Sequence, residues 1–75
     1  MHKWNRERLI EYAKSLGFDV LDGVPQPGES YIAGRNTEPV LLTCESVHER
    51  GWVQPKEFPA YPYDLHECVR VSLRS

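Results

Sequence analysis

This 75-residue sequence lacks any long hydrophobic run. No stretch approaches the roughly 18 consecutive apolar residues that a membrane-spanning helix needs. The first residues are polar, unlike the apolar core of a secretory signal. We therefore expect a cytoplasmic protein without a membrane segment.

Signatures of catalysis are also missing. The sequence has no G-x-x-x-x-G-K-[ST] phosphate loop and no G-x-S-x-G elbow. An H-E-x-x-H zinc-protease motif fails because His48-Glu49 is followed by Arg-Gly-Trp. A chain of this length has a thin core, which leaves little room for a substrate pocket of roughly 300 Å3 or more. We expect a non-enzymatic protein that needs no cofactor.

The charge pattern lacks a basic excess, since the formal net charge is −2. Residues 15–49 contain one arginine against six acidic residues. Nucleic-acid binding needs a concentrated basic face, so we do not expect it for the chain as a whole. The run from His2 to Arg8 mixes basic residues with an aromatic ring, Trp4, and these are the residue types that contact phosphates and bases.

One helix is predicted over residues 6–16. Its apolar residues recur at helical spacing, at Leu9, Tyr12, Ala13 and Leu16. Asn5 is a suitable N-cap, and Gly17 can adopt the left-handed conformation that ends a helix.

The remainder is predicted to form short strands and turns. Apolar or alternating stretches indicate strands near residues 18–21, 31–35, 40–43, 52–54 and 68–73. Pro27-Gly28 suits the centre of a type II turn, and residues 36–39 suit a hairpin loop. These elements predict one α+β domain over residues 1–75, with an N-terminal helix packed on a three- or four-stranded antiparallel sheet.

Cysteine and histidine are scarce, yet four of these residues form two close pairs, Cys44-x-x-x-His48 and His66-x-Cys68. Zinc prefers four tetrahedral ligands, and thiolates with imidazoles are common among them. The spacings differ from those of the usual zinc ribbons and fingers. A zinc-stabilised module that contacts nucleic acid is therefore an alternative hypothesis.

Residues 43–51 decide this question. If a strand continues through Cys44, that thiol lies on the apolar face, whereas Cys68 lies on the polar face of its own strand, and one ion can hardly reach both. If Thr43 instead caps a short helix that ends at Gly51, Cys44 and His48 share a helical face. The simpler hypothesis makes Cys44 a small core residue.

Residues 58–63 concentrate three aromatic side chains among prolines. Two alternatives remain open: the rings turn inward and cover the end of the sheet, or they turn outward and form a contact surface.

By elimination we expect binding to another protein, as an accessory, regulatory or inhibitory factor such as phages and mobile elements encode. The predicted anchors are Phe58, Tyr61 and Tyr63, with Trp52 as a fourth. Glu45 and Glu49 would steer a basic partner. A homodimer formed through the final strand, at a sheet edge, is a second arrangement to consider.

Overall fold

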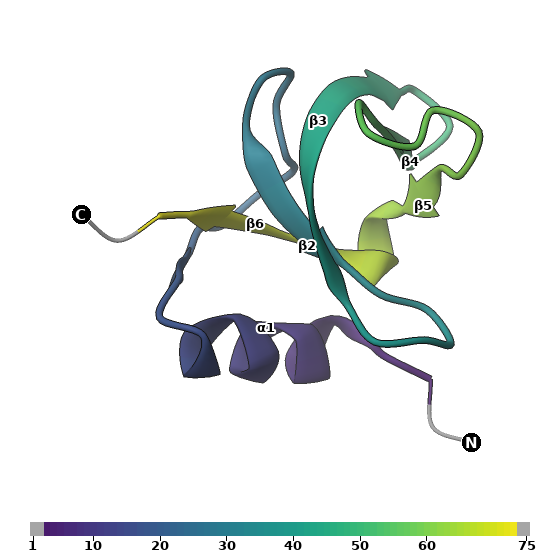
Figure 1. Cartoon of the computed structure of the whole chain (residues 1–75). Coiled ribbons are helices and arrows are strands. Elements are labelled where there is room, and N and C mark those ends of the chain that lie inside the picture. Colours follow the sequence, from purple (N-terminus) through teal and green to yellow (C-terminus); the bar gives the residue numbers. More distant parts are fainter. Residues whose placement is uncertain (1–2, 74–75) are drawn as a thin grey trace.

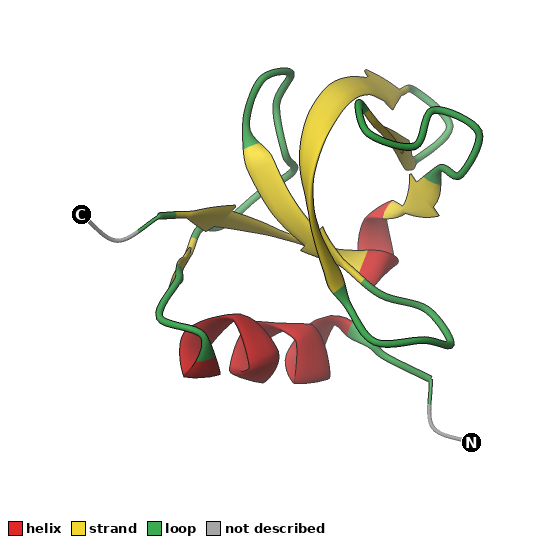
Figure 2. Cartoon of the chain, viewed as in Figure 1, coloured by secondary structure: helices red, strands yellow, loops and turns green. Residues whose placement is uncertain are grey.

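The computed structural model describes residues 3–73, which form one α-helix, one 3-10 turn and six strands (Figures 1 and 2). The elements are α1 (Arg6–Ser15), β1 (Asp19–Val20), β2 (Ser30–Ala33), β3 (Val40–His48), β4 (Trp52–Pro55), β5 (Tyr63–Asp64), η1 (Leu65–Glu67) and β6 (Cys68–Ser72). All strand pairs are antiparallel, in the order β1-β6-β2-β3-β4-β5. The predicted α+β class is confirmed, but the sheet has six strands rather than three or four.

Five of the six strands lie where the sequence indicated strands, β1 within residues 18–21 among them, and only β5 was not predicted. β5 contains two residues, too few to carry an alternation of its own, and its pairing with β4 defines it. The placement of β6 also corrects a prediction. It lies between β1 and β2, so the final strand is not at the edge of the sheet.

Local signals place α1 where the sequence predicted it. The Asn5 side chain accepts a hydrogen bond from the Arg8 N–H at 2.9 Å, which caps the first turn. At the other end Gly17 has φ +90°, and its N–H donates to the Lys14 carbonyl at 3.0 Å. The Phe18 N–H then donates to the Ala13 carbonyl at 3.1 Å, which completes a Schellman motif.

One side of the sheet packs against α1. We call the buried cluster there the helix-side core; its members are Leu9, Ala13, Ile32, Val69 and Val71. The helix approaches the sheet closely at Gly34, where an added Cβ would lie 3.3 Å from the Leu9 side chain and 3.2 Å from Pro39. A side chain at position 34 would therefore crowd both Pro39 and Leu9.

The other side of the sheet encloses a second cluster, which we call the inner core: Tyr31, Ala33, Leu42, Cys44, Val53 and Cys68. It is enclosed because β3 changes partner along its length. Residues 40–43 of β3 pair with β2, while the stretch from Cys44 to His48 pairs with β4, with a register shift between Cys44 and Ser46. Bulges bend strands, and Figure 1 shows β3 arching over the sheet.

Two predicted turns are also present. The Glu29 N–H donates to the Gln26 carbonyl at 2.9 Å around Pro27-Gly28, with Gly28 at φ +89°. Residues 34–39 connect β2 to β3 as a hairpin. Within residues 3–73, no helix is long and apolar enough to span a membrane.

Candidate functional site

Strand β3 settles the structure of residues 43–51. It continues through Cys44 to His48, so the alternative of a short helix there is wrong. The chain reverses only after His48, where the Gly51 N–H donates to the His48 carbonyl at 2.9 Å and Gly51 has φ +101°. Cys44 consequently points into the inner core rather than along a helix face.

Cys68 is also buried in the inner core, which corrects the expectation that it lies on a polar face. The start of β6 is covered on both sides, by α1 on one and by the curled sheet on the other. Burial raises the pKa of both thiols, that of Cys68 to about 12. The two thiols therefore share a cluster, as packed apolar groups rather than thiolates.

The two imidazoles lie outside that core. His48 stacks on Trp52 across the β3–β4 pair, with ring centroids 4.0 Å apart and planes 9° from parallel. Its Nδ1 accepts a hydrogen bond from the Arg50 N–H at 3.2 Å. The His66 side chain is 78% exposed. The structure therefore does not gather Cys44, His48, His66 and Cys68 around one point.

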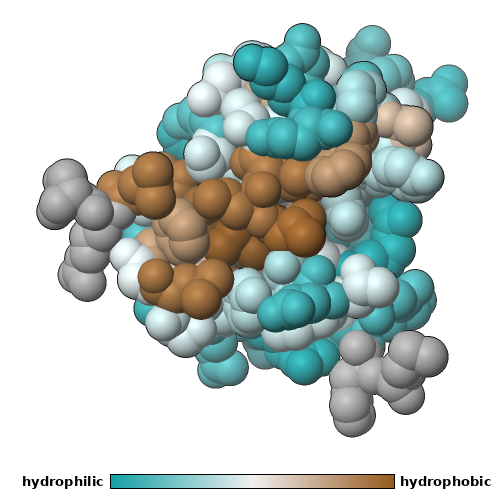
Figure 3. All heavy atoms as spheres, viewed as in Figure 1, coloured by the Kyte–Doolittle hydropathy of each residue, from teal (hydrophilic) through white to brown (hydrophobic). Residues whose placement is uncertain are grey.

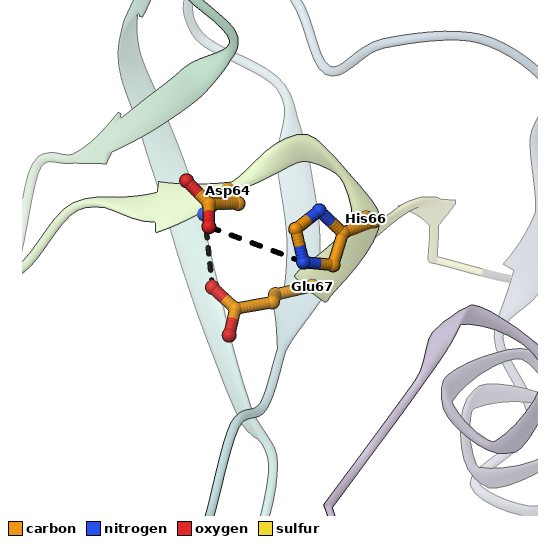
Figure 4. A group of neighbouring side chains, drawn as sticks. All are labelled: Asp64, His66 and Glu67. Atoms are coloured by element: carbon orange, nitrogen blue, oxygen red, sulfur yellow. Dashed lines mark hydrogen bonds and ion pairs between the residues drawn. The ribbon is translucent and has the colours of Figure 1, made fainter.

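A different group of ligand-type side chains lies together at η1. Among the described residues, Asp64, His66 and Glu67 have one potential ligand atom each within 4.8 Å of the others (Figure 4). The His66 Nε2 lies 3.9 Å from an Asp64 carboxylate oxygen, and the Asp64 N–H donates to Glu67 Oε1 at 3.0 Å.

Glu67, however, is already engaged by Arg35. The guanidinium donates to both oxygens of the nearly buried Glu67 carboxylate, at 2.7 and 2.8 Å. This interaction holds the pKa of Glu67 below its usual range. Arg35 also donates to the Pro62 carbonyl at 3.2 Å and lies 5.2 Å from the centre of the Tyr63 ring. The group is thus a structural ion pair that joins the β2–β3 loop, β5 and η1.

The sequence interpretation missed this pair. Arg35 and Glu67 are 32 positions apart, and nothing local relates them. One signal was present: Asp64-Leu-His-Glu67 has the spacing of a capping box, in which the second acidic side chain accepts from the first residue's N–H. That contact is the 3.0 Å hydrogen bond from Asp64 to Glu67.

Residues 56–62, which we call the aromatic loop, connect β4 to β5 and are tied at both ends. At the start, the Lys56 N–H donates to the Thr43 carbonyl at 2.8 Å, and Glu57 Oε1 accepts from the Thr43 N–H at 2.9 Å. Arg35 holds Pro62 at the far end. Between them the Tyr61 N–H donates to the Phe58 carbonyl at 2.9 Å, which closes a turn.

The sequence left open whether these aromatic rings turn inward over the sheet or outward into solvent, and the structure has some of each. Phe58 and Tyr61 are 53% and 69% exposed, whereas Tyr63, the first residue of β5, packs against the inner core. Trp52 is half-buried beside His48. The outward-facing rings of the segment are therefore those of Phe58 and Tyr61.

The two predicted acidic residues lie along β3 and its turn. Glu45 is exposed beside the bulge of β3, and Glu49 is exposed in the turn that follows. Together with His48, Arg50 and Trp52, Glu49 lines a surface hollow of about 590 Å3.

Near the N-terminus, basic and aromatic side chains contact one another. The Arg8 guanidinium lies 4.4 Å from the centre of the Trp4 ring, and Tyr12 meets that ring edge-on at 5.3 Å. The Trp4 N–H donates to the Arg35 carbonyl at 3.0 Å. The Trp4 backbone thus ties the start of α1 to the β2–β3 loop; His2 lies outside the described residues.

The geometry defines a small α+β domain with an anchored loop that displays two aromatic rings. The chain matches no protein-family model, and no curated protein or solved structure is significantly similar to it. Its function is therefore inferred from the arrangement of its own residues.

Proposed function

We propose that this protein acts by binding another protein, with Phe58 and Tyr61 of the aromatic loop as the anchoring side chains. The observation that carries the proposal is the exposure of both rings on a loop whose two ends are held by hydrogen bonds. Aromatic rings bury a large area while losing few rotamers. A loop that is already ordered also loses less conformational entropy on binding.

The acidic residues of the middle of the chain favour a basic partner. Glu45 and Glu49 are exposed, and residues 15–49 carry six acidic residues against one basic residue. Such a surface accelerates encounter with a positively charged partner and makes the rate sensitive to salt. An accessory, regulatory or inhibitory role fits a domain that works through contact alone.

The state of the thiols supports a non-enzymatic role. A catalytic cysteine needs a thiolate at an accessible position, close to a base. Cys44 and Cys68 are buried, their pKa values are raised, and their sulfurs lie near the Pro25 and Asp64 carbonyls.

Site-specific photocrosslinking tests the proposal. A benzophenone amino acid replaces Tyr61 in one variant, and replaces the exposed Glu11 of α1 in a control variant. Irradiation in lysate of the source organism should give one discrete adduct from position 61 and none from position 11. Adding salt should reduce the yield of that adduct. Equal labelling from both positions, or none from position 61, would refute the role of the loop.

A stability measurement accompanies this test. Added in excess, Tyr61→Ala without the crosslinker should compete with the crosslinking variant less well than the wild-type chain does. The substitution should change the free energy of unfolding by less than ~0.5 kcal/mol, because the ring is mostly exposed. A substantial loss of stability would mean that Tyr61 belongs to the folded core.

A further inference from the structure

The first half of β3 is an open edge of the sheet. It pairs with β2 on one side, whereas the pairing with β4 on the other side begins only at Cys44. In an antiparallel pair, successive residues direct their N–H and C=O groups alternately toward and away from the partner strand. The Cys44 N–H donates to the Glu29 carbonyl at 2.8 Å, so Cys44 and Leu42 face β2. The backbone groups of Leu41 and Thr43 therefore face away from β2.

Thr43 and Leu41 differ in what they meet on that side. The Thr43 carbonyl accepts from the Lys56 N–H at 2.8 Å, and its N–H donates to the Glu57 carboxylate at 2.9 Å. A regular ladder would use the Lys56 carbonyl instead, so the chain is already leaving the line of β4 at this point. Among residues 3–73, no turn, loop or side-chain hydrogen bond involves the Leu41 N–H or carbonyl.

Exposed apolar side chains border the unpaired backbone groups on both sides of the sheet. Leu41 pairs with Ile32, on the helix-facing side, and is 48% exposed. Val40 pairs with Ala33 of the inner core, on the opposite side, and is 41% exposed. Figure 3 shows that hydrophobic residues reach the surface in a band across the molecule in this view. Free backbone groups with apolar neighbours on both sides are what an added β-strand pairs with.

The charges around this edge determine which strand it suits. Three exposed carboxylates border it, those of Glu38, Glu45 and Glu57. One exposed lysine, Lys56, opposes them, and Arg35 is neutralised by the ion pair described above. The hollow on the adjoining helix has one charge of each sign, Arg8 and Glu11. The excess is acidic, so the edges of two copies would repel each other, whereas a basic segment complements the edge.

We propose that the open edge of β3 at Leu41 binds an extended segment of a partner protein, which adds a short antiparallel strand in line with β4. The segment residue opposite Leu41 donates to the Leu41 carbonyl and accepts from the Leu41 N–H. That residue and its neighbour are apolar, because they meet Leu41 and Val40, and basic residues flank them. This inference rests on the proposed function in that the partner is a protein, but it does not depend on Phe58 or Tyr61.

Amide hydrogen exchange, measured by NMR, tests the edge with a designed probe, the capped peptide Lys-Thr-Val-Ile-Thr-Lys. In the free chain, the Leu41 N–H should exchange at least about tenfold faster than the Leu42 N–H, which β2 protects. About 1 mM peptide should slow the exchange of Leu41 by about fivefold or more. A peptide with both central amides N-methylated cannot donate from either of its edges and should give no protection. Replacing both lysines of the peptide by glutamate should weaken binding several-fold.

A proline at position 41 tests the same bond from the side of the protein. Leu41→Pro removes an N–H that the fold does not use, so the variant should stay folded, as prolines at sheet edges do, and bind the peptide at least about tenfold more weakly. The matched control Leu41→Val retains the N–H and should bind as the wild type does. The N-methylated peptide gives the same information if Leu41→Pro does not fold.

Three outcomes would overturn the open edge as a binding site. They are an unchanged Leu41 exchange rate at about 1 mM peptide, equal protection by the N-methylated peptide, and protection of Leu41 that grows with protein concentration when no peptide is present. The last would assign the edge to a second copy of the chain. Tyr61→Ala should bind the peptide as the wild type does. A crosslinked adduct from position 61 with Leu41 unprotected would reject the edge alone, whereas peptide binding without that adduct would reject only the aromatic loop.

Discussion

The two sides of the sheet are closed in different ways. The inner core is built from strand residues and is enclosed by the curl of the sheet itself. The helix-side core depends on α1, a single ten-residue helix that supplies Leu9 and Ala13. The curl of the sheet encloses the inner core except near the start of β3, where Val40 is 41% exposed, whereas one helix cannot cover a side wider than itself. The exposed Leu41 is the consequence.

Polar groups also distribute unequally between the two sides. The inner core contains the Tyr31 hydroxyl, which is buried and has no hydrogen-bond partner among the described residues, and the Arg35–Glu67 pair lies close by, against Tyr63. The helix-side core is built from aliphatic side chains. The comparison predicts which substitutions each side tolerates.

The largest effect is expected on the helix side. Leu9→Ala should lower the free energy of unfolding by ~3 kcal/mol, because Leu9 is fully buried and its loss leaves a cavity beneath α1. Leu41→Ala, on the same side but half exposed, should cost less than ~1 kcal/mol. Urea denaturation of both variants measures the difference, and equal losses would show that α1 does not seal this side.

Glu67→Gln should have the next largest effect, a loss of ~2 kcal/mol at neutral pH, because it removes one charge of a nearly buried pair. Glu29→Gln, which removes a carboxylate that is 32% exposed against 11% for Glu67, should cost less.

The effect of Glu67→Gln should depend on pH. The folded-state pKa of Glu67 lies below its unfolded value, so its stabilisation is present above the unfolded pKa and is lost as pH falls through the folded pKa. The advantage of the wild type over Glu67→Gln should therefore shrink in acid. An advantage that is constant from neutral pH to about pH 3 would contradict the ion pair.

The thiols should behave as buried apolar groups. Ellman's reagent should label Cys44 and Cys68 slowly in the native protein and rapidly in denaturant, because burial raises both pKa values and blocks access. Cys44→Ser should cost ~1 kcal/mol more than Cys44→Ala, since a hydroxyl needs a stronger hydrogen bond than the thiol has. Rapid labelling of the native protein would place a thiol at the surface.

The smallest effect is expected for Tyr31→Phe. Removing a buried hydroxyl that has no protein partner should change the free energy of unfolding by less than ~0.5 kcal/mol or raise it slightly. Differential scanning calorimetry resolves this change. A loss above ~1 kcal/mol would mean that an internal water bonds to the hydroxyl.

Local signals account for the parts of the fold that were predicted. The cap at Asn5, the stop at Gly17 and the turn at Pro27-Gly28 each depend on a few adjacent residues and the backbone conformations they allow. Contacts between segments that are distant in the sequence could not be predicted from such local signals. The burial of Cys68 needs α1 and β3 on opposite sides of β6, and the Arg35–Glu67 pair needs the hairpin loop and η1 to meet.

The same division applies to the candidate site. The segment of residues 58–63 was identified by composition, but its rings separate because Arg35 and the inner core retain Tyr63 while the turn from Phe58 to Tyr61 faces solvent. Which side chains are exposed depends on how the whole chain packs. When a sheet is covered on both sides, the alternation of residues along one strand does not identify its exposed side chains.

By itself, the sequence determined where the helix begins and ends, where the chain turns, and the α+β class, because capping, glycine conformation and hydrophobic spacing act over a few residues. The tertiary structure alone decided which side chains face solvent. The bend of β3 at Cys44–Ser46 moves both thiols inside, and the limited width of α1 leaves Leu41 outside. Both outcomes depend on how whole elements pack against one another, which the spacing of adjacent residues does not encode.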